Sequence, residues 1–203
     1  MTYDPSTRDV ALGETALAQL FAEARTRNDF SDRPVPEALL HRLYDLTKFG
    51  PTAVNSTPAR FLFLTSTEAR QRLAPLMSGN NREKTLKAPV NVIVGMDTEF
   101  HEQLLRLFPH APGAKDWFAD EAARKESAFR KSSLQGGYFL IAARALGLDV
   151  GAMSGFDAAG VKAEFFAGTS VEPNFILNLG YGTDENLFPR SPRLNFDEAA
   201  QIL

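Results

Sequence analysis

The stretch from Lys48 to Leu64 reads KFGPTAVNSTPARFLFL and places a polar loop of small residues between a helical pattern and an apolar strand pattern. Pro51 and Pro58 restrict the backbone at both ends of this loop, and hydroxyls and the amide of Asn55 line it. A surface connection without a role does not need this combination. A rigid loop with polar side chains is suited to hold a planar ligand with polar edges, so we expect it to contribute to a binding site.

The segments on both sides of this loop predict helices alternating with buried strands. Apolar residues recur at helical spacing over 14–25, 36–49, 66–76, 98–107, 115–146 and 157–166. Short apolar runs bounded by Gly, Pro or Asn predict strands over 61–65, 90–96 and 174–180. Because the connections are too long for hairpins, we expect an α+β fold with a mixed central sheet and helices on both faces.

Length and composition favour one soluble domain. The 203 residues show no internal repeat and no long linker, so we expect a single domain over 1–203. The absence of cysteine excludes a disulfide framework and thiolate chemistry, and it is compatible with the cytoplasm, where we expect the protein. No apolar run of membrane-spanning length is present, and a net charge of −3 gives no general attraction to nucleic acid. We therefore expect neither a membrane nor a nucleic acid as partner.

The helical pattern over 132–147 has apolar or small residues on nearly every side, which is typical of a helix buried all round. Such a helix lies either in the centre of a monomer or against a second copy of the chain. Small residues at Gly136, Gly137, Ala142, Ala143 and Ala145 permit a close approach of two backbones. We favour the homodimer, and an ordinary core helix is the alternative.

Five segments occur in the order seen in the FMN-dependent nitroreductase superfamily, and the sequence resembles that superfamily. They are 25–30 (RTRNDF), 50–58 (GPTAVNSTP), 81–84 (NREK), 145–149 (ALGLD) and 154–157 (SGFD). Within the superfamily the chain is most similar to the malonic semialdehyde reductase branch, through 126–135, 153–157, 165–168 and 190–194. The resemblance implies a three-layer nitroreductase-like fold and a homodimer with FMN at the interface. It also implies hydride transfer from NADH or NADPH through flavin N5, by a ping-pong mechanism.

The resemblance also implies which residues hold the flavin phosphate. These are Arg25, Thr26, Arg190 and Arg193, and guanidinium forks are suited to bind phosphate. Asn28 stands where the superfamily often has a second cation, which leaves Lys84 as the main cation for the flavin ring. From the residues alone, Arg25 is equally well explained as a cation at a helix C-terminus.

Three further segments are implied to contact the flavin ring. Asn81 and Lys84 share one helical face at the pyrimidine edge, although such pairs are also common on solvated helices. The loop residues Pro51, Thr52, Ala53 and Asn55 are implied to reach the ring from the partner subunit, and a capped turn is their alternative. Ala152, Met153, Ser154 and Gly155 are implied to lie close to N5, with Ser154 in the place of a glutamate found in many nitroreductases. Ser132, with Ser133 and Gln135, is implied to make polar contacts, and a helix N-cap is its alternative.

Other sites are less favoured by the sequence. His41, His101 and His110 show no metal-binding spacing and fall on polar helix faces or beside Pro109, so we expect no metal site. Four aromatic residues are expected in the core, with a lid over the flavin as the alternative: Phe108, Trp117, Phe118 and Phe129.

Three functions follow from the resemblance. The first is a flavin-dependent aldehyde reductase acting on malonic semialdehyde, with Ser154 in the substrate site. Arg60 is then a candidate anchor for the substrate carboxylate, although a solvated residue at a strand start explains it better. The second is a nitroaromatic or quinone reductase of broad specificity. The third is a flavin-binding protein without turnover.

Overall fold

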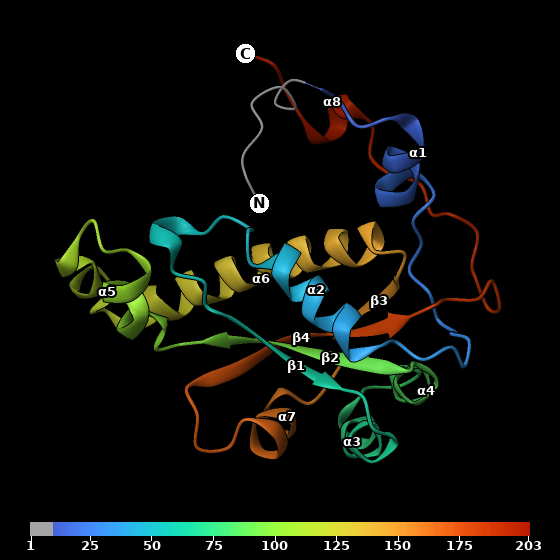
Figure 1. Ribbon diagram of the computed structural model, residues 1–203, viewed down its shortest axis with the longest axis horizontal. Coiled ribbons are helices and arrows are strands. Elements are labelled where there is room, and N and C mark those ends of the chain that lie inside the picture. The colour runs from blue at the N-terminus through green and yellow to red at the C-terminus, as the bar shows by residue number, and fades with distance from the viewer. Residues whose placement is uncertain (1–9) are drawn as a thin grey trace.

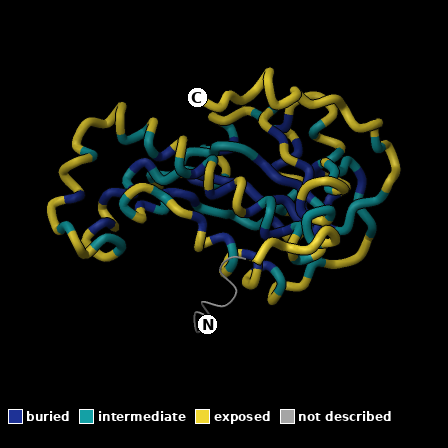
Figure 2. The backbone as a smooth tube through the Cα atoms, turned by 90° about the horizontal axis from the view of Figure 1, so that it is seen from above, coloured by how far each residue is buried: buried dark blue, intermediate teal, exposed yellow. Residues whose placement is uncertain are grey.

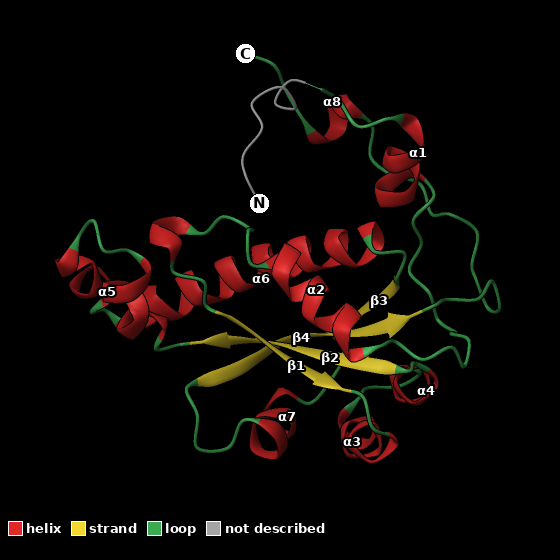
Figure 3. Cartoon of the chain, viewed as in Figure 1, coloured by secondary structure: helices red, strands yellow, loops and turns green. Residues whose placement is uncertain are grey.

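The computed structural model describes residues 10–203, and its centre is a four-stranded sheet with helices on both faces (Figure 1). The strands are β1 (Ala59–Leu64), β2 (Val90–Asp97), β3 (Asp149–Met153) and β4 (Val171–Gly180). They lie in the order β1-β2-β4-β3, and every neighbouring pair is antiparallel. Thr26 and Val150 form an isolated parallel bridge at the β3 edge. The predicted α+β architecture, with helices on both faces of the sheet, is confirmed (Figure 3), and the mixed character of the described sheet is limited to this bridge.

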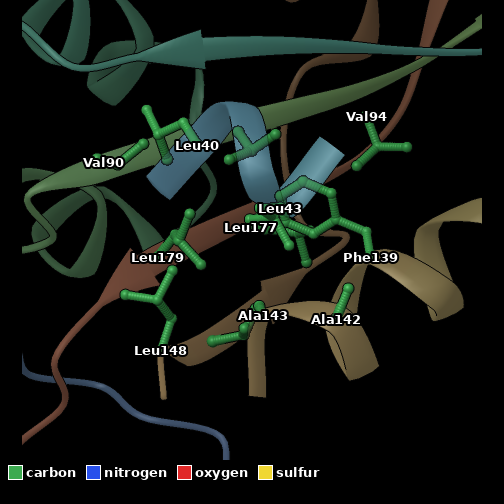
Figure 4. Packing of buried hydrophobic residues seen from close by; sticks show 12 residues of the cluster. Leu40, Leu43, Val90, Val94, Phe139, Ala142, Ala143, Leu148, Leu177 and Leu179 are labelled. Atoms are coloured by element: carbon green, nitrogen blue, oxygen red, sulfur yellow. The ribbon is translucent and has the colours of Figure 1, made fainter. Parts of the chain in front are cut away.

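The two faces of the sheet carry separate apolar cores because strand side chains alternate in direction. Val92 and Leu177 point toward α2 (Glu37–Thr47) and α6 (Glu121–Ala145), which cover one face. Figure 4 shows this packing, with Leu40 and Leu43 of α2 close to Phe139 of α6. Ile93 and Ile176 point to the other face, where α3 (Thr67–Leu73) and α7 (Ala158–Phe165) supply apolar partners. Each fully buried side chain of this size contributes about 1.5–3 kcal/mol.

Helix α6 has one face buried against the sheet and one exposed face. It begins at Asp120, whose carboxylate accepts a hydrogen bond from Ala123 N (2.8 Å), and it ends just before Gly147, whose φ is 75°. Gly136 faces the sheet, where a Cβ would lie 2.3 Å from the Phe175 ring. The opposite face leaves Leu134 exposed. One face of α6 is therefore core, and the other is open in the single chain.

The remaining helical segments are short. They are α1 (Glu14–Leu17), η2 (Ala18–Ala22), η3 (Ala53–Asn55), η4 (Ala74–Leu76), α4 (Asn81–Lys87), η5 (Phe100–Gln103), α5 (Leu104–Leu107), η6 (Pro112–Phe118) and α8 (Phe196–Ala199). Across residues 10–203 no helix is both long enough and apolar enough to cross a membrane.

Some predictions of local structure were wrong. The sequence pattern gave no strand at 149–153, because Gly151 and Ala152 have little strand preference. The expected helix over 115–146 is interrupted, since η6 ends at Phe118 and Asp120 caps a new helix. Trp117 and Phe129, expected in the core, are 63% and 53% exposed.

Burial is uneven along the chain. Figure 2 shows buried residues concentrated in the interior of the molecule, whereas the C-terminal arm, residues 186–203, is almost entirely exposed. This arm carries large apolar side chains on its surface, namely Phe188, Leu194, Phe196, Ile202 and Leu203.

Asp29 ties the start of this arm to the body of the protein. Asp29 is only 7% exposed. Its carboxylate binds Lys87 Nζ (2.7 Å) and accepts a hydrogen bond from Asn186 Nδ2 (2.9 Å). The bond to Lys87, followed by the bond to Asn186, holds the pKa of Asp29 below its ordinary value. The charged form is therefore the one that stabilises the fold.

We expect Asp29→Ala to lower the free energy of unfolding at pH 7 by about 1–3 kcal/mol, because Lys87 and Asn186 lose their acceptor. Since the pKa is lowered on folding, the wild-type advantage is complete above the ordinary aspartate pKa and is lost as the pH falls through the folded-state value. Urea unfolding at pH 7 and near pH 3 measures both effects. Asp32→Ala, at an exposed neighbouring carboxylate, is the control. A difference that is unchanged at low pH would contradict this assignment.

Candidate functional site

Two segments far apart in the sequence, 22–31 and 181–190, lie antiparallel beside the β3 edge (Figure 1). Phe30 and Gly182 form a backbone bridge at one end of this pairing. Bonds in the same register continue it: Ser31 N donates to Tyr181 O (2.9 Å), Asn28 Nδ2 to Asn186 O (3.0 Å), and Arg190 Nη2 to Ala22 O (2.6 Å). Side chains replace the usual backbone ladder over most of the pairing. As a result, Arg25 and Arg190 line the same pocket.

Arg27 attaches this pairing to the sheet. Its Nη1 donates to Thr183 O (3.1 Å) and contacts the Asp184 carboxylate, while its Nε lies 3.4 Å from Asp149 Oδ1 at the start of β3. Burial alone would lower the pKa of Arg27, but the bond to Asp184 and the charge of Asp149 raise it above its ordinary value. Gly182 makes room for this side chain, because a Cβ there would lie 2.3 Å from Arg27 Cγ.

A pocket of about 310 Å³ opens where the paired segments meet α4 and the C-terminal end of α6. Its lining holds no carboxylate but five cations, which are Arg25, Lys84, Arg144, Arg190 and Arg193. Thr26 and Asn28 add a hydroxyl and an amide. Six residues predicted from the sequence to bind the cofactor are thus brought to one pocket by the fold.

The five cations have no bonded counterion in the part of the chain that the structure describes. None of them takes part in an ion pair with a carboxylate there. The four arginines among them bind backbone carbonyls instead, as Arg25 does with Phe188 O. By contrast, Arg60 and Arg124 elsewhere in the fold bind Asp97 and Glu99. A group of unpaired cations in one small pocket favours a compact, multiply charged anion such as a phosphate.

Helix α4 connects this pocket to the segment that follows β3. Asn81 Nδ2 donates to Gly155 O (3.2 Å), and Ser78 N donates to the same oxygen (3.0 Å). A Cβ on Gly155 would lie 3.1 Å from Asn81 Nδ2, so a glycine allows this close approach. Lys84 lies one turn further along α4 and faces the pocket. Asn81, Lys84 and Gly155 therefore form one continuous surface.

The end of β3 and the residue that follows it offer two exposed positions. Gly151 and Met153 are buried, whereas Ala152 and Ser154 are exposed. Any group that lies along this edge meets a methyl group and a hydroxyl, with no charge from either. Such an edge is suited to one side of a flat ligand.

The loop 51–55 does not line the pocket in the single chain. Pro51, Ala53 and Asn55 are exposed, and Asn55 Nδ2 donates to Leu107 O (3.0 Å) of α5. Thr52 Oγ1 accepts a hydrogen bond from Thr57 N (3.1 Å), which closes the loop. Val54 and Asn55 have φ values of 50° and 49°, a region that is strained for a β-branched residue such as Val54. The loop is thus held in a fixed, partly strained shape with its side chains open to a neighbour.

Three polar residues from the sequence prediction lie elsewhere. Asn174 Nδ2 donates to Ser132 Oγ (2.8 Å) and Ser133 Oγ (3.0 Å), and Gln135 Oε1 accepts from Ala59 N (2.9 Å). These bonds attach α6 to the sheet, and the structure does not bring Ser132 to the pocket.

Arg60 does not offer a free guanidinium. Its Nη2 lies 2.5 Å from Asp97 Oδ2, and its Nη1 donates to the carbonyls of Thr57 and Ala59. This gives no support for Arg60 as a substrate anchor.

His101 is buried rather than on a polar helix face, which corrects the sequence-based expectation. Its ring nitrogens lie 3.7 Å from carboxylate oxygens of Glu99 and Glu102. Those carboxylates also bind Arg124 (2.9 Å) and Lys115 (2.7 Å). The group is thus a local charge network that holds η5 and η6 to the start of α6.

The sequence analysis missed two residues of the site, Arg27 and Arg144. Neither belongs to a motif that stands out by spacing. Arg27 follows two residues already assigned, and Arg144 reads as a cation in the last turn of a helix. Only the meeting of α6 with the paired segments shows that Arg144 lines the pocket.

Comparisons with known sequences point in one direction. The sequence profile described as the Nitroreductase family matches residues 22–181. A relative from Caulobacter sp. (strain K31) has the provisional name NADH dehydrogenase/NAD(P)H nitroreductase. It is 65% identical over 192 residues, which cover 95% of this chain and 98% of the relative. A relative of the same provisional name from Burkholderia lata is 60% identical over 192 residues, covering 94% and 98%.

Comparisons with solved structures give the same fold. A provisionally named nitroreductase, ydfN from Bacillus subtilis, has a TM-score of 0.84 and 20% identity, covering 94% of this chain and 100% of the other. A provisionally named nitroreductase from Exiguobacterium sibiricum, solved in complex with FMN, has a TM-score of 0.83 and 19% identity, covering 96% and 99%. At these identities the likeness concerns the fold.

Proposed function

Because this chain belongs to the nitroreductase family, we infer that it is an NAD(P)H-dependent oxidoreductase that uses FMN, and we propose that it reduces a small aldehyde as a homodimer. The observation that carries the proposal is the pocket of five cations without a carboxylate. Its charge and size fit the phosphate group of FMN. Bound FMN supplies the redox chemistry, because its N5 accepts a hydride from a reduced nicotinamide and passes it to the second substrate.

The residues of the pocket divide into two groups. We assign Arg25, Thr26, Arg190 and Arg193 to the phosphate, since the paired segments bring them together at one wall of the pocket. We assign Asn81 and Lys84 to the pyrimidine edge of the ring, because α4 joins the pocket to the exposed edge at Ala152 and Ser154. At that place the Lys84 ammonium favours the negative charge of a reduced ring. Asn28 is engaged with Asn186, so we give it a positioning role.

The homodimer is supported by what the single chain leaves open. The outer face of α6 exposes Leu134 and Gly137, and the apolar C-terminal arm lacks a core of its own. Strand β1 is an edge of the described sheet, beside a hollow of about 990 Å³ lined by α2, β1 and α5. The loop 51–55 is closed by the hydrogen bond to Thr52 Oγ1, and its residues Pro51, Ala53 and Asn55 are exposed. We propose that a second copy covers these surfaces and that its loop completes the flavin site.

We propose malonic semialdehyde, a small aldehyde with a carboxylate, as the acceptor, with 3-hydroxypropionate as product. The carbonyl carbon gains the hydride, and the carbonyl oxygen gains a proton from solvent. Support comes from the resemblance to the malonic semialdehyde reductase branch and from Ser154, which is exposed and neutral beside the pocket. A glutamate at this position would repel a small anionic substrate. The provisional names of the relatives point instead to nitro compounds, which the kinetic experiment below includes as alternative substrates.

We expect the purified protein to contain FMN, about one per chain, and Arg193→Ala to weaken FMN binding by about 1.5–3 kcal/mol through loss of a charge-assisted bond. Flavin fluorescence titration of the apoprotein measures the dissociation constant. Arg72→Ala, at a cation that pairs with Glu164 on the other face of the sheet, should leave it unchanged. A colourless protein that takes up no FMN would refute the cofactor assignment. A protein that binds FMN but oxidises neither NADH nor NADPH would show a flavin-binding protein without turnover.

The dimer is tested by adding a side chain at Gly137. A Cβ at this position meets nothing within 4 Å in the single chain, so Gly137→Glu leaves the monomer intact and even favours its helix. In a dimer packed on α6, the same change buries a charge at the interface. We expect light scattering to report a dimer for the wild type and mostly monomer for Gly137→Glu. Ala163→Glu, on α7 at the opposite face, is the matched control. A wild-type monomer loaded with FMN would exclude the proposed assembly.

The acceptor is tested by Ser154→Glu. We expect a selective loss of kcat/KM for malonic semialdehyde, about tenfold if the added charge costs about 1.4 kcal/mol, with menadione little affected. Steady-state rates with malonic semialdehyde, nitrofurazone and menadione, each with NADH and NADPH, measure this. An equal loss of kcat/KM for all acceptors would contradict the proposal that a neutral residue at position 154 favours an anionic substrate. No wild-type activity on the semialdehyde would leave a nitroaromatic or quinone reductase as the function.

A further inference from the structure

Arg144 is the one cation of the pocket that comes from a helix of the core rather than from α4, the paired segments or the C-terminal arm. It lies in the last turn of α6 and is half-buried. Its Nη1 donates to Leu20 O (3.0 Å), and its own carbonyl accepts a hydrogen bond from Gln19 Nε2 (2.7 Å). The first bond holds the side chain against η2 and the second ties the backbone of Arg144 to it, and the other guanidinium nitrogens make no bond to protein among residues 10–203.

The charges around Arg144 do not compensate it. Burial lowers the pKa of its guanidinium, and the nearby Asp149 carboxylate offsets only part of this effect. Both oxygens of Asp149 are already engaged, one with Arg27 Nε (3.4 Å) and the other with Gly182 N (2.9 Å). The other charged groups of the pocket are cations, which repel Arg144. A partly desolvated cation in this position gains from an anion that enters the pocket.

We propose that Arg144 binds the phosphate of FMN and gives the protein its preference for FMN over riboflavin. This inference rests on the proposed function and adds a residue that the cofactor assignment above does not contain. Arg190 and Arg193 are exposed, whereas Arg144 is half-buried and bonded to Leu20 O. A guanidinium fixed before the ligand arrives loses less conformational freedom on binding than an exposed one.

A purely structural role is the competing explanation. A cation in the last turn of α6 interacts favourably with the helix dipole, and its bond to Leu20 O fastens η2 to α6. Loss of either effect would lower the stability of the protein. Neither effect would distinguish FMN from riboflavin, which carries the same ring without the phosphate.

The experiment therefore compares two ligands rather than two activities. Apoprotein of the wild type, Arg144→Gln, Arg144→Lys and Arg70→Gln is titrated with FMN and with riboflavin by flavin fluorescence. Arg70 is the matched control, because it is also tied to backbone carbonyls, those of Ser66 and Ala88, but lies outside the pocket. We expect Arg144→Gln to weaken FMN binding roughly 10- to 100-fold and to leave riboflavin binding unchanged.

Arg144→Lys keeps the charge without the fork, so its preference for FMN over riboflavin should lie between those of wild type and Arg144→Gln. This variant keeps the proposal testable if Arg144→Gln does not fold. As a second readout, inorganic phosphate should raise the Tm of the wild-type and Arg70→Gln apoproteins more than that of Arg144→Lys.

An unchanged ratio of the FMN and riboflavin dissociation constants in both Arg144 variants would overturn the inference, even if their stability falls. That result would leave the proposed function standing as long as the wild type binds FMN. Failure of the wild type to bind either flavin would instead remove the proposed function itself.

Discussion

The pairing of residues 22–31 with 181–190 is the constraint on which the rest of the site depends. It joins the beginning of the fold to its end, and side chains rather than a backbone ladder hold most of it together. Arg27 links three parts of the structure, since it binds the C-terminal segment at Thr183 and Asp184 and the sheet at Asp149. Without this pairing, nothing would hold the segment with Arg25 beside the segment with Arg190.

The repulsion among the five cations of the pocket is opposed by interactions in the parts of the fold that support it. Like charges repel, and the described pocket supplies no carboxylate to balance them. The acidic groups lie just behind it, where Asp29, Asp149 and Asp184 bind Lys87 and Arg27 and hold the supporting segments in place. This arrangement stabilises the scaffold and leaves the pocket wall positive. An anionic ligand then adds stability that grows with the logarithm of its concentration relative to its dissociation constant.

The chain also shows where the site is incomplete. The loop 51–55 is closed by the Thr52 hydroxyl and held to α5 by Asn55, yet it does not line the pocket of its own chain. Strain at Val54 is retained by a structure that gains nothing from it locally. The open face of α6 and the exposed apolar arm lie on the same side of the sheet as this loop (Figure 1). These three features are the ones that the proposed homodimer would cover.

The sequence by itself determined the elements that depend on local periodicity and on punctuation by Gly, Pro and capping residues. The helices over 37–47 and 158–165, the buried strands β2 and β4, and the polar loop after Gly50 follow from such signals. It also determined which residue types are available for an anion, because Arg25, Lys84, Arg190 and Arg193 stand in recognisable segments.

Only the tertiary structure decided which of these residues meet. Strand β3 forms because β4 offers it an edge, although Gly151 and Ala152 have little strand preference of their own. Ser132 carries a suitable hydroxyl but faces Asn174 in the sheet, and Arg144 carries no motif but faces the pocket. Spacing along the chain fixes the side of a helix on which a residue lies. What that side faces depends on contacts between segments far apart in the chain, 42 residues for Ser132 and Asn174 and 124 residues for Arg144 and Leu20.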